Sequence, residues 1–335
     1  MSALTPLLSI RDLKVYFSIA SDSPWPWTAP RALKAVDGVS FDIFPGETLG
    51  IVGESGCGKS TLARAMLNLI PANAGSIVWQ GQEMRGATAQ AWQDIRKNVQ
   101  MIFQDPLASL NPRMTVGQII AEPLQTHFHQ MSKQDVMQKV RAMMAKVGLT
   151  EQQINRYPHE FSGGQCQRIG IARALVLEPK LVICDEPVSA LDVSIQAQII
   201  NLLMELQAEM GLALVFIAHD LAVVKHISQR VMVMYLGRSM ELATKQAIYQ
   251  HPCHPYTQAL LSAIPLPDPK RERNKTLQLL PGDLPSPMNP PSGCSFRTRC
   301  PKAIASCALQ RPELRALSAD TQVACDVVAL MSPGV

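Results

Sequence analysis

A glycine-rich loop, Gly53-Glu-Ser-Gly-Cys-Gly-Lys-Ser60, constrains this chain more than any other feature of its sequence. The loop fits the pattern G-x-x-x-x-G-K-[ST], follows an apolar segment typical of a buried strand (Thr48–Val52), and opens a predicted helix that runs to about Leu69. Glycines let the backbone wrap closely, so that N–H groups and the helix N-terminus face a phosphate. Lys59 adds a positive charge for the β- and γ-phosphates, and Ser60 adds a hydroxyl for Mg²⁺. The loop therefore predicts a site for a nucleoside triphosphate.

A second element supplies the acids that such a site needs. The segment Leu181-Val-Ile-Cys-Asp-Glu186 is an apolar strand that ends in two carboxylates. Asp185 is placed to bind Mg²⁺, directly or through water. Glu186 is placed to act as the general base for the attacking water. Because adjacent residues leave a strand in opposite directions, the two roles are sterically compatible.

Short apolar strands alternate with helices, which predicts an α/β core with a mainly parallel sheet. Residues 7–17 are predicted to form the first strand. Residues 32–51 are predicted to form a hairpin, with a turn at Pro45–Gly46, followed by the buried strand. The other predicted elements are a helix over 132–147 that begins at a capping box of Ser132 and Asp135, a helix over 194–210, and a buried strand over 213–218.

The composition changes near residue 250. From there to residue 300 prolines recur, which excludes a central strand or a long helix and predicts an extended arm leading to a small cysteine-bearing lobe. A Pro/Ser-rich loop over 18–31 carries Trp25 and Trp27. These two side chains could contact a partner, the lipid headgroup zone, or the chain's own sheet.

Charge and hydropathy limit the classes of partner. The formal charge is +4, too mild for a clustered nucleic-acid-binding face, so no nucleic acid is expected. No run of about 18 apolar residues is present, and the N-terminus lacks the pattern of a signal peptide. We therefore expect a protein of the cytosol that meets a membrane through a partner.

A third motif lies between the loop and the acids. The segment Phe161-Ser-Gly-Gly-Gln-Cys-Gln-Arg168 resembles the LSGGQ signature of ABC ATPases, with Phe161 where that family usually has Leu. The resemblance implies a P-loop ABC ATPase with a RecA-like core, an antiparallel β subdomain, a helical subdomain at about 105–165, and a small cysteine-containing C-terminal extension. The implied domains are a nucleotide-binding domain over 7–250 and an arm with a peptide-importer domain over 251–330.

The resemblance also assigns roles. Gln104 resembles the Q-loop glutamine, Ser189-Ala-Leu-Asp192 the D-loop, and His219 the switch histidine. Tyr16 is similar in position to the aromatic that stacks on adenine, with Phe17 as the alternative. In the family each ATP lies between the phosphate loop of one subunit and the signature of another. The residues implied to contact ATP or Mg²⁺ are Tyr16, Gly53, Glu54, Ser55, Gly56, Cys57, Gly58, Lys59, Ser60, Thr61, Gln104, Asp185 and, across the pair, Ser162, Gly163, Gly164, Gln165 and Asp192.

The C-terminal arm and domain over 251–330, called the tail below, narrow the resemblance to one subfamily of ABC ATPases. The segments beginning His254-Pro-Tyr-Thr and Leu284-Pro-Ser-Pro resemble the ends of oligopeptide/dipeptide importer ATPases, most closely the F-type ATPase of oligopeptide permeases. Such importers pair this subunit with a D-type ATPase, two membrane permeases and an extracytoplasmic solute-binding protein, which implies a peripheral subunit on the cytoplasmic face of the inner membrane. Nickel and glutathione importers share the subfamily. A soluble ABC ATPase of translation or repair, or an exporter subunit, are the remaining alternatives.

Four of the eight cysteines, with the spacing Cys294-x₅-Cys300-x₆-Cys307-x₁₇-Cys325, fall in this tail. Four thiolates suit a [4Fe–4S] cluster or a structural Zn²⁺, although the absence of a C-x₂-C pair weakens the zinc interpretation. Members of the peptide-importer group can carry an iron–sulfur cluster here, which the resemblance transfers to these positions. The alternative is four reduced cysteines packed as small apolar side chains.

Overall fold

The structure, a computed structural model, describes residues 5–19, 31–265, 273, 275 and 277–330. Its residues divide into two compact units, each described by itself. The first unit takes in Met1–Leu7, Ile43–Thr48 and Gly86–Ala218, and the second takes in Leu8–Asp42, Leu49–Arg85 and His219–Val335. Trp25 and Trp27 lie outside the described residues.

The first unit contains three parallel strands. β7 (Leu181–Asp185) pairs with β6 (Val99–Ile102) on one side and with β8 (Ala213–Ala218) on the other. Every residue of β7 and β8 is buried, as expected of parallel strands covered on both faces. The acid pair at the end of β7 is thus held by a rigid strand.

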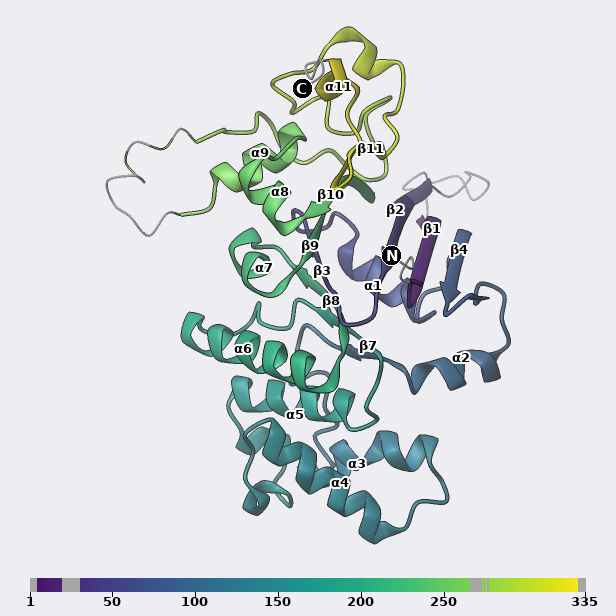
Figure 1. The fold of residues 1–335 in the computed structure, drawn as a ribbon, viewed down its shortest axis with the longest axis vertical. Coiled ribbons are helices and arrows are strands. Elements are labelled where there is room, and N and C mark those ends of the chain that lie inside the picture. The colour runs from purple at the N-terminus through teal and green to yellow at the C-terminus, as the bar shows by residue number, and fades with distance from the viewer. Residues whose placement is uncertain (1–4, 20–30, 266–272, 274, 276, 331–335) are drawn as a thin grey trace, which may run out of the picture. The chain divides into compact units, whose positions relative to one another are not determined.

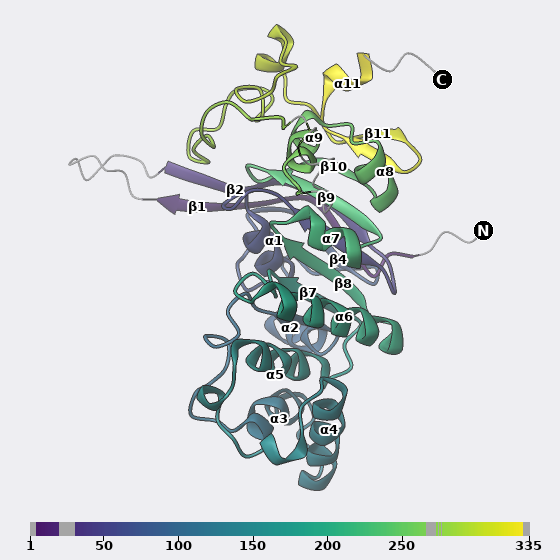
Figure 2. The same cartoon turned by 90° about the vertical axis from the view of Figure 1, so that its left-hand side faces the viewer.

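The helices of the first unit include three, α3, α4 and α5, that lie side by side (Figures 1 and 2). α4 begins at Ser132, whose hydroxyl oxygen accepts from the Asp135 N–H at 3.1 Å, which confirms the predicted start. The Asp135 carboxylate accepts from the Ser132 hydroxyl rather than from its backbone, so the reciprocal half of the capping box is absent. The helices are α2 (Ala89–Arg96), α3 (Val116–His127), α4 (Lys133–Lys146), α5 (Gly163–Leu175) and α6 (Val193–Met210), with 3₁₀ turns at Glu151–Gln153 and Pro158–Glu160.

The second unit contains strands of two sheets. One sheet has the order β2–β1–β4–β5, formed by Arg31–Ile43, Leu8–Ile19, Ala74–Trp79 and Gln82–Glu83. In the other, β3 (Thr48–Val52) runs parallel to β9 (Arg230–Tyr235), and β10 (Arg238–Thr244), β12 (Thr321–Val323) and β11 (Arg315–Ser318) follow in antiparallel order. The helices are α1 (Lys59–Met66), α7 (Leu221–Ile227), α8 (Lys245–Gln250), α9 (Pro255–Ser262) and α11 (Asp326–Leu330), with a 3₁₀ turn at Ala305–Ala308.

The predicted hairpin around Pro45–Gly46 is wrong. The turn joins β2 to β3, but these strands belong to different sheets. β3 is buried along its whole length and pairs in parallel with β9, whereas the end of β2, residues 39–43, alternates between buried and half-buried positions. A strand buried on both faces needs a parallel partner covered by helices, which a hairpin neighbour does not supply.

The proline-rich segment is less extended than predicted. α9 forms within it, because its proline stands at the first helical position, where the missing N–H costs no hydrogen bond. Beyond the arm, the tail adds β12 and β11 beside β10 (Figure 1). Among the described residues, no helix combines the length and apolarity that crossing a bilayer requires.

The cap of α9 gives the stability of the chain a pH dependence. His254 is 1% exposed, and its Nδ1 accepts from the Tyr256 N–H at 3.0 Å. Burial lowers its pKa from 6.5 to about 3, so the folded state keeps the imidazole neutral while the unfolded chain binds a proton below pH 6.5. Stability is therefore complete above pH 6.5 and falls as the pH drops toward 3. The titration of His254 alone should account for a loss of about 2 kcal/mol between pH 7 and pH 5.

The measurement is urea unfolding over this pH range, compared with His254→Asn, which keeps a capping acceptor but does not titrate. The difference between the two proteins cancels the opposing contribution of buried Glu241, whose pKa is raised by burial and which accepts from the His254 N–H. His251→Asn, which removes an exposed imidazole, is the control. Equal pH slopes for the wild type and His254→Asn would contradict this prediction.

Candidate functional site

The phosphate loop leaves β3 and enters α1, as its sequence predicts. Gly58 has φ +102, and a Cβ added there would lie 2.0 Å from the Ala35 carbonyl oxygen. A Cβ on Gly53 would lie 2.2 Å from the Met234 carbonyl oxygen. Other residues would clash at both positions, so the path of the loop depends on these two glycines.

The loop has the features of an anion cradle. No side chain caps the N-terminus of α1, and its first turn carries no acidic residue. The space where a Gly56 side chain would stand is open to 4 Å. Lys59, only 4% exposed, places its Nζ 2.7 Å from the Gly53 carbonyl oxygen and 3.1 Å from that of Glu54. The ammonium is therefore held across the loop, and the residues fit a polyphosphate.

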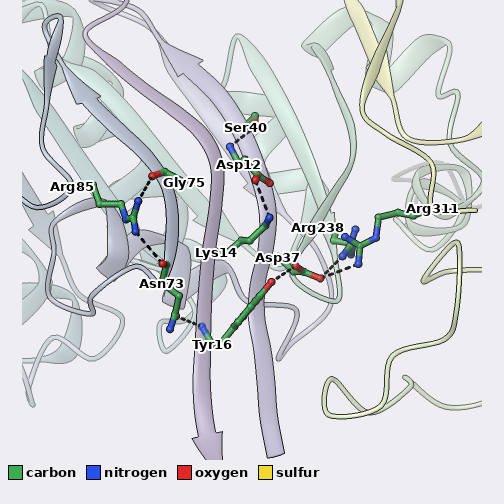
Figure 3. A network of polar contacts seen from close by, with 10 residues as sticks. All are labelled: Asp12, Lys14, Tyr16, Asp37, Ser40, Asn73, Gly75, Arg85, Arg238 and Arg311. Carbon is green, nitrogen blue, oxygen red and sulfur yellow. Dashed lines mark hydrogen bonds and ion pairs between the residues drawn. The ribbon is translucent and has the colours of Figure 1, made fainter.

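The aromatic predicted to stack on adenine lies in β1 of the same unit. The Tyr16 hydroxyl donates to the Asp37 carboxylate at 2.6 Å (Figure 3). The Lys34 Nζ lies 5.8 Å from the Tyr16 ring centroid. Burial and the hydrogen bond to Asp37 raise the pKa of Tyr16. Tyr16 is half-buried and Phe17 is 36% exposed, so neither is a core side chain. The choice between them stays a prediction.

The acids of the first unit are arranged for distinct roles. Asp185 is 1% exposed at the end of β7, whereas Glu186 is half-buried. Glu186 adopts φ +46, an uncommon backbone for a side chain of its size, and its N–H donates to the Ile217 carbonyl at 3.1 Å. The Gln104 amide donates to the Glu186 carboxylate at 3.0 Å. The structure therefore brings the predicted base and the predicted Q-loop glutamine together.

The signature segment begins α5. Ser162 is the N-cap and forms a reciprocal capping box with Gln165, in which each side chain accepts from the other's backbone N–H. A Cβ on Gly164 would lie 2.6 Å from Ile195, so glycine is required for this approach to α6. Asp192 is the N-cap residue of α6. The segment thus presents a glycine-lined helix N-terminus, as predicted.

The predicted site residues fall in both units. The phosphate loop, Tyr16 and His219 belong to the second unit, and His219 is an exposed residue directly after β8. Gln104, the signature, Asp185, Glu186 and Asp192 belong to the first.

Two contacts of the phosphate loop escaped prediction. The Tyr256 hydroxyl accepts from the Glu54 N–H at 3.0 Å, and Arg299 donates to both carboxylate oxygens of Glu54, at 3.0 and 2.9 Å. Both residues come from the tail, about 200 residues or more along the chain from the loop. No periodicity or motif in the sequence marks such a long-range contact.

The four tail cysteines lie near one another in the second unit. The Cys294 N–H donates to the Cys307 carbonyl at 2.8 Å, and Cys307 and Cys325 pack in one small apolar cluster with Cys253. Burial, with smaller contributions from the neighbouring thiols, raises the pKa of Cys294 to about 11. In the part of the chain that the structure describes, no three His, Cys, Asp or Glu side chains form a group that could hold a metal ion. The geometry therefore does not support the predicted cluster.

Known protein families and individual relatives match most of this chain. Residues 36–189 match the ABC transporter family, and residues 240–307 match the oligopeptide/dipeptide transporter C-terminal region. The chain is 66% identical over 308 residues to the oligopeptide transport ATP-binding proteins OppF of Salmonella typhimurium and of Escherichia coli, covering 92% of each chain. It is 62% identical over 319 residues to OppF of Haemophilus influenzae, covering 95% of this chain and 96% of the relative.

Solved structures share the fold. The ATP-binding cassette MJ0796, in a dimeric post-hydrolysis state with ADP and Pi, matches with a TM-score of 0.63 and 24% identity over 71% of this chain and 98% of its own. CbiO1 from Clostridium perfringens matches with a TM-score of 0.62 and 26% identity over 73% of this chain and 91% of its own. The phosphate loop, the signature and the acid strand all lie within the family match, and the relatives extend it through the tail. The chain therefore belongs to the oligopeptide-transport family of ABC transporter ATP-binding proteins.

Proposed function

We propose that this chain hydrolyses ATP to drive the import of oligopeptides or dipeptides through a membrane transporter. The observation that carries the proposal is one chain that joins an intact phosphate loop and acid pair to a tail matching the oligopeptide/dipeptide transporter region. An exporter or a soluble ABC ATPase has no need of such a tail.

Each side chain of the site has a separate role in ATP hydrolysis. The loop amides and Lys59 bind the phosphates, and Glu186 accepts a proton from the attacking water while Gln104 holds its carboxylate. Bound Mg²⁺ neutralises charge on the phosphates. The ligands that fit it are a hydroxyl, an amide and a buried carboxylate, from Ser60, Gln104 and Asp185. Tyr16 stacks on adenine, and His219 senses the γ-phosphate.

A second ATPase subunit completes two sites. The chain carries one phosphate loop and one signature, and the signature offers a helix N-terminus suited to an anion. In the proposed pair, Ser162, Gly163, Gly164, Gln165 and Asp192 act on the ATP of the partner. Closure of the pair on ATP moves two membrane permeases, and hydrolysis reopens it. The partner is a D-type ATPase, an extracytoplasmic protein delivers the solute, and this subunit lies on the cytoplasmic face of the inner membrane.

The domain division proposed from the sequence follows the same roles. A nucleotide-binding domain over 7–250, with a helical subdomain at about 105–165 facing the permeases, carries the ATP chemistry. An arm and C-terminal domain over 251–330 complete the chain.

The test is transport by the complex reconstituted in lipid vesicles with its permeases and second ATPase. We expect ATP-dependent uptake of labelled peptides, with ATP hydrolysis stimulated by the peptide-loaded binding protein. Uptake of nickel or glutathione without peptides would reassign the solute but keep the transporter ATPase. Failure to co-purify with any permease from membranes would contradict the transport function.

We further propose that Cys294, Cys300, Cys307 and Cys325 bind an iron–sulfur cluster, on the strength of the family resemblance and of the gathering of these four residues. Binding of a cluster would require these side chains to rearrange, because in the part of the chain that the structure describes no three of them form a metal-binding group. Iron and acid-labile sulfide are measured on protein purified anaerobically, with Cys307→Ser expected to lower both and Cys253→Ser, at a neighbouring thiol outside the set, as the matched control. Colourless, iron-free wild-type protein would contradict the cluster.

A further inference from the structure

The tail holds the phosphate loop through a partly buried, two-point contact within the second unit. Arg299 donates through one guanidinium nitrogen to both oxygens of Glu54, and the pair is partly buried, with side-chain exposures of 11% for Arg299 and 27% for Glu54. The Tyr256 hydroxyl accepts from the Glu54 N–H. The second residue of the phosphate loop is therefore fixed by its side chain and by its backbone at once.

The two contacting side chains are themselves held rigidly. The rings of Tyr235, Tyr256 and Phe296 pack mutually, with centroids 4.8 to 5.3 Å apart, and all three are fully buried. The Arg299 guanidinium carbon lies 6.0 Å from the Tyr235 ring centroid. Because these rings cannot shift independently, the position of Glu54 is set by the packing of the tail.

A second arginine of the tail reaches the sheet that carries Tyr16. Arg311 donates to the Asp37 carboxylate at 3.2 Å, and the same carboxylate accepts from Arg238 and from the Tyr16 hydroxyl (Figure 3). The tail thus contacts the phosphate loop at Glu54 and reaches Tyr16, the residue predicted to stack on adenine, only through Asp37.

We propose that Arg299 is a positioning residue for ATP binding, which holds the phosphate loop in its binding conformation through Glu54 and makes nucleotide affinity depend on the folded tail. The inference rests on the proposed function of the loop. Free Glu54 would place a mobile negative charge at the mouth of an anion site, whereas the ion pair both neutralises and anchors it. Because linkage is reciprocal, nucleotide bound at the loop must in turn stabilise the tail around Arg299.

The test compares the dissociation constant of a fluorescent ATP analogue among full-length variants. Arg299→Gln should weaken binding about tenfold, because it frees the Glu54 carboxylate at an anion site. Glu54→Gln and the double variant lose the anchoring contact but leave no such charge, so they should weaken binding less. Arg299→Lys keeps the charge without the two-oxygen contact, so its dissociation constant should lie between those of the wild type and Arg299→Gln. Arg297→Gln removes the same charge two residues away, where the side chain contacts Ser292, and should bind like the wild type.

Wild-type protein supplies a readout that needs no variant. Hydrogen exchange of residues 294–301 should slow at least about threefold when a non-hydrolysable ATP analogue binds, and this protection should be lost in Arg299→Gln. Unchanged affinity in folded Arg299→Gln, or unchanged exchange in the wild type with analogue bound, would overturn the proposal. Wild-type protein that binds no ATP would instead overturn the function proposed for the loop, and the inference with it.

Discussion

Replacing Glu186 by Gln is expected to lower the rate of ATP hydrolysis by at least about 100-fold while leaving ATP binding intact. The substituted amide keeps the size of the side chain and can still bond to Gln104, but it cannot accept a proton from water. The loop that binds the phosphates is untouched. With binding retained and hydrolysis blocked, the ATPase pair should accumulate in its closed form.

Phosphate release measured on the assembled transporter checks the rate, and filter binding of labelled ATP checks retention. Glu205→Gln is the matched control, because it makes the same change at an exposed residue of α6. A Glu186→Gln variant that hydrolyses ATP at the wild-type rate would remove Glu186 from the role of base.

Replacing Asp37 by Ala is expected to cost about 3 kcal/mol of folding free energy, the larger of the two stability effects predicted here. The Asp37 side chain is 6% exposed and the Arg238 side chain 14%, so the substitution leaves a guanidinium largely buried without its counter-charge. It also removes the acceptors of Tyr16 and Arg311 (Figure 3). A loss of this size comes from uncompensated burial rather than from the lost attraction alone.

The free energies of unfolding of Asp37→Ala and Asp42→Ala, measured in urea, distinguish the effect of burying an ion pair from the effect of the pairing itself. Asp42 pairs with Arg11 at 2.7 Å, but the two side chains are 29% and 51% exposed, so its removal should cost under about 1 kcal/mol. If both variants lose equal free energy of unfolding, the burial of Asp37 and Arg238 does not add to the cost of removing an ion pair, and the prediction is wrong.

The elements predicted correctly from the sequence are those in which function or burial restricts residues that are close together in the chain. The strand–loop–helix around Lys59 and the fully buried strands β7 and β8 are confirmed, because a phosphate loop and a doubly covered strand each restrict which residues can stand in a row. The Ser132 cap is likewise a contact between near neighbours. Such features are encoded within a few residues, so one sequence suffices to find them.

Contacts between distant segments were not predictable in the same way. Nothing around Pro45 indicates that β3 pairs with β9, about 180 residues later, rather than turning back on β2. Similarly, Arg299 looks like a surface charge beside a cysteine until the fold brings it to Glu54. These partners are chosen by topology, and the arrangement of four cysteines likewise follows from packing rather than from spacing.

The strands that the tail adds beside β10 have a consequence for any shortened form of this protein. β12 covers the edge of β10 over Glu241–Ala243, and β11 then covers β12. A chain that stops before Arg315 would expose a row of main-chain donors and acceptors, an open template on which identical copies can stack. Such a truncation should precipitate, and its inactivity would report the bare edge rather than the missing Cys325 thiol.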